Sequence, residues 1–149
     1  MTDGESPYLG LDVVTRRIGV ATTDPTAQFA FPRETVDASD LTEAAERIRE
    51  LVVELGTHTI VVGWPLTLDG EEGRAVERVE TFLAEVESVF ERAGDELPDV
   101  IEWDERMTTR AAEDFLIDAD VRRRKRREVV DQIAASHILK GYLDSLDRE

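Results

Sequence analysis

The stretch YLGLDVVTRRIGVATT (8–23) decides the fold of this chain of 149 residues. It holds two β-rich runs, residues 8–14 and 16–23, which a tight connection separates. A third extended run, FAFPRETV (29–36), follows the turn at Asp24 and Pro25. Connections this short join antiparallel neighbours, because parallel strands need a long crossover. The first part of the chain is therefore predicted to be an antiparallel meander.

After the meander, helical and extended patterns alternate. A helix is expected over residues 40–56, with Asp40 and Glu43 as a capping box and Gly56 at its carboxyl end. Further elements are expected as strands at 57–63 and 99–105 and as helices at about 74–92, at 110–118 after Thr109, and at about 127–146. This order predicts an α/β fold with a mixed five-stranded sheet, in which parallel strands extend the meander and helices cover both faces. We expect residues 1–149 to form one domain, with residues 1–7 as a flexible tail.

The composition excludes several classes of protein. The chain has no cysteine, which excludes disulfides, thiolate nucleophiles and cysteine zinc sites, and its only histidines are His58 and His137. No apolar run is long enough to span a membrane, and the acidic first residues lack the pattern of a secretory signal. We therefore expect a cytoplasmic protein that does not contact membranes.

The charge is strongly acidic but unevenly distributed. The formal net charge is −16, from 18 basic and 34 acidic residues, and only Lys125 and Lys140 are lysines. The run RRRKRR (122–127) alone holds six of the basic residues. An acid-rich, lysine-poor surface is expected of a protein that works in high salt, where screening reduces self-repulsion. Our hypothesis is a halophilic protein whose net charge reflects the solvent more than the partner.

Two carboxylates occupy positions where burial costs free energy. Asp12 ends the apolar run of the first strand, and Asp131 shares a helical stripe with Ala135 and Ile138. A buried carboxylate needs a hydrogen bond, a charged partner or a cation. The alternatives are a turn-forming aspartate at position 12 and a half-buried aspartate at position 131 that the helix dipole stabilises.

Asp104 and Glu105 end the last predicted strand, where alternation sends their side chains to opposite faces. One of them can turn toward the crevice beside the sheet, although ordinary strand-end charge is an alternative. Three carboxylates from two strand ends and one helix can converge there. Mg²⁺ and Mn²⁺ prefer such oxygen ligands, and a pair of these ions cleaves phosphodiesters without histidine or cysteine.

Four ordered segments are similar to those of the YqgF/RuvX family, which belongs to the RNase H-like superfamily and is related to the resolvase RuvC. They are YLGLDVVTRRIGVATTD, IVVGWPLTLDGEEG, DERMTTRAAEDFL and RRRKRREVVDQIAASHILKGYLD, and they span about residues 8–146. The resemblance implies an RNase H-like nuclease, dependent on two Mg²⁺ or Mn²⁺ ions, that processes the 5′ end of precursor 16S rRNA in ribosome biogenesis. Holliday-junction resolution is the older proposal. The family's acids fall on Asp12, Glu105 and Asp131, which implies that these three are the catalytic and metal-binding residues. Val14 departs from the family's usual glycine.

Basic residues close to these acids are candidates for nucleic-acid binding. Arg16 and Arg17 follow Asp12, and the basic run precedes the final helix near Asp131. The candidates are Arg16, Arg17, Arg122, Arg123, Arg124, Lys125, Arg126 and Arg127. The alternative for the run is a solvated basic loop, and the alternative for one of the first two arginines is simple solvation.

The competing function from another class is a non-catalytic nucleic-acid-binding domain with the same fold. An inward carboxylate at position 131 favours the nuclease, because a binding module has no reason to keep it. The sequence leaves open RNA or DNA as substrate, endo- or exonuclease action, and a monomer or a homodimer.

Overall fold

The computed structural model describes residues 7–24, 26, 29–65, 73–104 and 123–147, and at 123–128 and 147 it describes the backbone alone. One mixed sheet runs through the centre of the molecule, in the strand order β3-β2-β1-β4-β5. Its strands are β1 (Tyr8–Val13), β2 (Arg17–Thr23), β3 (Ala30–Asp37), β4 (Thr59–Trp64) and β5 (Asp99–Asp104). The first three strands pair antiparallel, while β4 and β5 extend the sheet in parallel from β1. The predicted five-stranded mixed sheet is confirmed.

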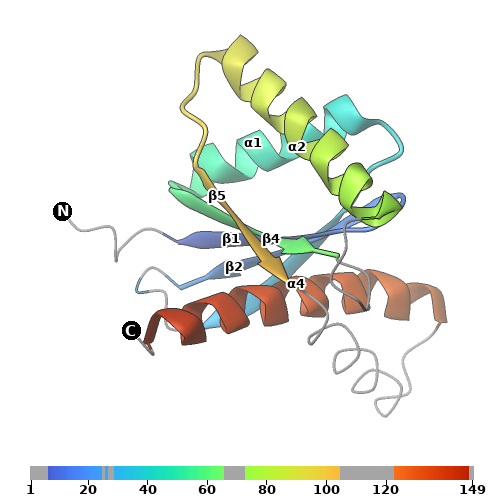
Figure 1. Ribbon diagram of the computed structural model, residues 1–149, viewed down its shortest axis with the longest axis vertical. Helices are drawn as coiled ribbons and strands as arrows, with labels where there is room; N and C mark the ends of the chain where they lie inside the picture. Colours follow the sequence, from blue (N-terminus) through green and yellow to red (C-terminus); the bar gives the residue numbers. More distant parts are fainter. Residues whose placement is uncertain (1–6, 25, 27–28, 66–72, 105–122, 148–149) are drawn as a thin grey trace.

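Helices cover both faces of the sheet, as predicted (Figure 1). The helices α1 (Leu41–Leu55) and α2 (Arg74–Ala93) lie on one face, and α4 (Arg123–Asp147) lies on the other. The start of α1 is fixed by Asp40, whose carboxylate accepts a hydrogen bond from the Glu43 N–H at 3.0 Å. Its end is fixed by Gly56, which takes the left-handed conformation with φ of 69°.

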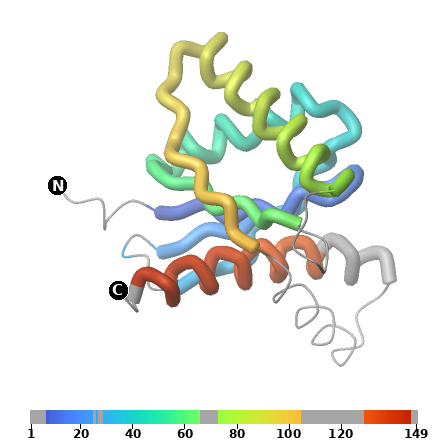
Figure 2. Tube along the Cα trace, viewed as in Figure 1, coloured from blue at the N-terminus to red at the C-terminus, as the bar shows by residue number. Residues whose placement is uncertain are grey.

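Side-chain alternation in β1 divides the interior into two cores. Leu9 and Leu11 point into the larger core beneath α1 and α2, together with Ile48 and Phe82. The smaller core lies beneath α4 and contains Ala21, Val61, Ala135, Ile138 and Leu139. The helix α4 packs mainly on β1, β2 and β3, and Figure 2 shows its course along that face. This second layer contains the candidate site.

The last helix begins earlier than the sequence analysis predicts. It starts at Arg123 rather than near Arg127, so the described part of the basic run is helical and the loop interpretation is wrong for it. Arginine and lysine are good helix formers, and no glycine or proline interrupts these residues, so nothing local delays the helix.

Some expectations fall on parts of the chain outside the described residues. These are the tail over residues 1–6, the acid Glu105, the helix at 110–118 with its cap Thr109, and Arg122. Among the helices that the structure describes, none is long and apolar enough to cross a membrane.

Candidate active site

A row of three paired residues crosses the sheet beneath α4. Asp12 in β1 pairs with Gly19 in β2, and Gly19 pairs with Thr35 in β3. Residues directly opposite each other on antiparallel strands point to the same face, with Cα atoms roughly 4.5–5.5 Å apart. Asp12 therefore points to the face that α4 covers, as its alternation with Leu9 and Leu11 predicts.

Two glycines let the backbone of α4 rest directly on the sheet. A Cβ atom at Gly19 would overlap the backbone carbonyl of Asp131, and one at Gly10 would lie 2.9 Å from the carbonyl oxygen of Ala135. Any side chain at Gly19 would therefore push the helix away from β2. The sequence analysis did not assign a role to either glycine, although an isolated glycine inside a strand is a signal of close backbone approach.

Asp12 and Asp131 both adjoin Gly19, because Asp12 is its partner on β1 and the backbone of Asp131 lies against it. Both residues are buried, with 6% and 4% of their surface exposed. Their carboxylates come from β1 and α4, and they are two of the three acids predicted to bind metal. Within the described residues no group of three or more acidic or histidine side chains could hold a metal ion, and the third predicted acid, Glu105, lies outside those residues.

Asp131 is held by an ion pair with Arg17. The Nε atom of Arg17 donates a hydrogen bond to Oδ2 of Asp131 at 2.5 Å. The side chain of Arg17 is 33% exposed, whereas that of Asp131 is 6% exposed. A short charge-assisted hydrogen bond of this kind is strong, because the carboxylate has little access to water.

The two arginines of the β1–β2 turn have different surroundings. Arg17 begins β2 and shares the α4 face with Gly19, while Arg16 is exposed. The turn is closed by the Val14 N–H, which donates to the carbonyl oxygen of Arg17 at 2.8 Å. Val14, the residue that departs from the family's usual glycine, thus fixes the start of the strand that carries Arg17.

A second contact fixes α4 over the same row. The Nε2 atom of Gln132 donates a hydrogen bond to Oγ1 of Thr35 at 3.0 Å. Asp131 and Gln132 are therefore both attached to side chains of the sheet, one on β2 and one on β3. These two contacts, from Arg17 and from Thr35, fix the Asp131 carboxylate over the sheet.

The basic run lies on the same helix as Asp131. Arg123–Arg127 form the first turns of α4 and precede Asp131 by four to eight residues. At 1.5 Å per residue this is about 6–12 Å along the helix axis. The helix thus carries a dense group of basic residues close to a candidate metal ligand.

The described donors fit a hard divalent cation. Two buried carboxylates supply anionic oxygen ligands, which Mg²⁺ and Mn²⁺ prefer, and the chain has no cysteine for a softer metal. The guanidinium of Arg17 beside Asp131 shows that this site attracts positive charge.

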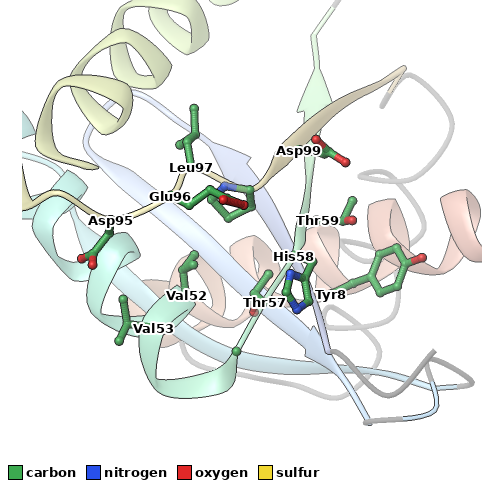
Figure 3. A pocket seen from close by; sticks show the side chains of 12 residues that line it. Tyr8, Val52, Val53, Thr57, His58, Thr59, Asp95, Glu96, Leu97 and Asp99 are labelled. Atoms are coloured by element: carbon green, nitrogen blue, oxygen red, sulfur yellow. The ribbon is translucent and has the colours of Figure 1, made fainter. Parts of the chain in front are cut away.

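A separate hollow of about 570 Å³ lies at the other end of the parallel strands (Figure 3). Tyr8, Thr59 and Asp99, the first residues of β1, β4 and β5, line it together with the loop after α2. Of the candidate site residues whose side chains the structure describes, none lines this hollow. The candidate chemistry is therefore at the carboxyl end of β1, on the α4 face.

The profile of the RuvX family, described as Holliday junction resolvase, matches residues 6–145. The chain belongs to the RuvX family. A relative named "Putative pre-16S rRNA nuclease" from Halalkalibacterium halodurans is 46% identical over 138 residues, which cover 91% of this chain and 94% of the relative. Relatives of the same name in Geobacillus thermodenitrificans and Cereibacter sphaeroides are 45% and 42% identical over 139 residues, covering 92% and 93% of this chain and 96% and 83% of those relatives. Family membership confirms the resemblance and the nuclease class predicted from the sequence.

Solved structures share the fold of this RuvX protein at low sequence identity. RuvC of Thermus thermophilus in complex with a Holliday junction substrate has a TM-score of 0.55 and 14% identity, covering 95% of this chain and 96% of that one. The fowlpox virus resolvase in complex with Holliday junction DNA has a TM-score of 0.55 and 10% identity, covering 94% and 98%. The predicted RNase H-like fold class is confirmed.

Proposed function

We propose that this RuvX protein is a divalent-metal-dependent nuclease that processes the 5′ end of precursor 16S rRNA, and that Asp12, Glu105 and Asp131 hold the metal. The observation that carries the proposal is that Asp12 and Asp131 are both buried and both adjoin Gly19. Precursor 16S rRNA is named as the substrate of the curated relatives. Work on precursor rRNA agrees with the cytoplasmic location that the composition predicts.

The protein's own residues supply charge, position and substrate contacts in this mechanism. Mg²⁺ or Mn²⁺, when bound, supplies an activated water and charge stabilisation of the leaving oxygen. Asp12 and Asp131 supply the anionic ligands, and their burial limits access of bulk water. The glycines beneath α4 fix the height of Asp131 over the sheet. Arg16, Arg17 and the basic run at 122–127 bind the phosphate backbone.

Holliday-junction resolution is the second candidate function. The family is described by that activity, and the RuvC and fowlpox virus structures hold junction DNA. The same carboxylates would serve, because phosphodiester cleavage in RNA and DNA can use the same metal chemistry.

A cleavage assay separates these functions. A precursor 16S rRNA fragment and a four-way DNA junction are each incubated with the protein in Mn²⁺ or in EDTA. We expect Mn²⁺-dependent cleavage of the RNA, its loss in Asp12→Asn, and its retention in Glu102→Gln, an exposed acid on β5 that loses the same charge. Cleavage of the junction alone would favour the resolvase, and binding of either substrate without cleavage would favour the non-catalytic domain.

A further inference from the structure

The ion pair between Arg17 and Asp131 occupies a carboxylate that the proposed function needs for a metal ion. The bond of 2.5 Å engages Oδ2 of Asp131, and the carboxylate is almost fully buried. A guanidinium and a divalent cation are both positive, so they compete for the same oxygen and repel each other at short range. Binding of a metal ion through Oδ2 of Asp131 therefore requires the hydrogen bond from Arg17 to weaken or break.

The packing decides which of the two partners can move. The backbone of Asp131 rests on Gly19, and the next residue, Gln132, is bonded to Thr35, so α4 is fixed at this point. Arg17 sits at the first position of β2, next to the turn, and a third of its side chain is exposed. A long side chain with access to solvent can change rotamer, whereas a buried side chain beneath a packed helix cannot.

We propose that Arg17 neutralises Asp131 while the protein is free of metal, and that a divalent cation displaces the guanidinium when it binds. Arg17 is a positioning residue in this scheme: its hydrogen bond holds the buried carboxylate of Asp131 in a fixed orientation until the cation takes over. This inference rests on the proposed function. Because displacement breaks a charge-assisted hydrogen bond, Arg17 lowers the affinity for the metal compared with a chain that lacks it.

The displaced guanidinium would remain on the α4 face, beside the site. There it can bind a phosphate oxygen of the substrate, which is the role the sequence predicts for Arg17. Metal binding would then make a phosphate-binding arginine available, and the two binding events would be positively coupled.

Calorimetric titration with Mn²⁺ alone tests the competition. Wild type, Arg17→Gln and Arg16→Gln are compared. Arg16→Gln is the control, because it also removes one positive charge from the same turn, but the arginine that it replaces is exposed. We expect Arg17→Gln to bind Mn²⁺ roughly tenfold or more tightly than Arg16→Gln, because no hydrogen bond with Asp131 has to be broken. Equal or weaker binding by Arg17→Gln would overturn the proposal, as would the absence of Mn²⁺ binding in all three proteins.

The wild-type cleavage assay separates a failure of this inference from a failure of the proposed function. Metal-dependent cleavage by a wild type whose affinity does not respond to Arg17→Gln would leave the nuclease standing and remove the displacement. If Arg17→Gln does not fold, Arg17→Lys replaces it, with a smaller gain in affinity expected. Lysine keeps the charge but loses the Nε donor.

A spectroscopic signature follows the same bond in the wild type. The side-chain Nε–H of Arg17, assigned by its loss in Arg17→Lys, should exchange slowly with water in the metal-free protein because it is hydrogen-bonded to a buried carboxylate. Addition of Mg²⁺ should shift this resonance and speed its exchange. A resonance that stays in place at saturating Mg²⁺ would show that the cation binds without displacing Arg17.

Discussion

At the residue scale, replacement of Asp12 and replacement of Asp131 should have the same effect on cleavage but different effects on stability. Asp12→Asn should abolish cleavage and leave the fold intact, because the amide keeps the shape of the side chain but holds Mg²⁺ poorly. Asp131→Asn should also abolish cleavage, but it should lower the melting temperature more, since it removes the charged partner of Arg17. Thermal melts of both variants without metal, beside the cleavage assay, give the comparison.

Added metal should also raise the thermal stability of wild type more than that of the same variants. Mn²⁺ is expected to stabilise wild type by RT ln(1 + [M]/Kd) and each variant much less. Glu105→Gln should behave like Asp12→Asn and Asp131→Asn. Combining any two of these three changes should lower cleavage by less than the sum of their separate effects, because the acids are expected to act as one unit. Equal stabilisation of wild type and Asp12→Asn by Mn²⁺ would remove Asp12 from the metal site.

Gly19 is the residue that lets the backbone of α4 at Asp131 lie against β2. Gly19→Ala should destabilise the fold by about 1–3 kcal/mol through overpacking and should lower cleavage strongly, because the helix must move away from β2. Gly10→Ala should have a smaller effect, since its Cβ would be 2.9 Å from the carbonyl oxygen of Ala135, a milder clash than the overlap at Gly19. Denaturant melts and cleavage rates are measured for both. A larger loss in Gly10→Ala would contradict this ranking.

At the scale of elements, local patterns predicted most of the fold. The cap at Asp40, the left-handed Gly56 and the apolar spacing of α2 are local signals, and the corresponding elements end where expected. The sequence pattern places the start of α4 too late, because a run of like charges is typical of a solvated loop although its residues favour a helix. The Arg17–Asp131 pair joins residues 114 positions apart, and periodicity predicts which face a side chain takes but not its partner.

The basic residues in the first turns of α4 are predicted to bind the RNA substrate. Replacement of Arg123–Arg127 by glutamine should weaken RNA binding and leave Mn²⁺ binding unchanged, and the helix should persist because glutamine is a good helix former. Each lost phosphate contact should flatten the log–log salt dependence of binding by roughly one unit. The control replaces Arg74 and Arg92 on α2, which lies on the other face of the sheet. An unchanged slope would show that the run is solvated.

The contact between α1 and the edge strand β3 should depend on pH. Nε and Nη2 of Arg47 donate to the two carboxylate oxygens of Glu34 at 2.9 and 2.8 Å, and this hydrogen bonding lowers the pKa of Glu34 below its usual value of 4.5. A lowered folded-state pKa stabilises the fold above the unfolded pKa, and this stabilisation is lost as pH falls through the folded value. Glu34→Gln should therefore cost roughly 0.2–1 kcal/mol at neutral pH and almost nothing at strongly acidic pH. Urea melts at both pH values test this, and a constant difference would contradict it.

At the scale of the whole molecule, the charge has two opposed consequences. The net charge of −16 makes the folded chain repel itself, and it also repels a nucleic acid on average. The basic residues at the start of α4 are the local site that we propose for phosphate on this acidic molecule. Salt therefore acts in opposite directions: screening relieves self-repulsion in the fold but weakens phosphate contacts.

These opposed effects give a test of the halophilic hypothesis. The screening length falls from about 10 Å at 0.1 M salt to about 3 Å at 1 M, so the melting temperature should rise between these KCl concentrations. A variant with glutamine at four exposed acids of α2, Glu77, Glu80, Glu87 and Glu91, should show a smaller rise, because less repulsion is left to screen. RNA binding by wild type should weaken over the same range. A rise of equal size in the variant would assign the stabilisation to general salt effects on apolar burial, and the acidic surface would then have no role in it.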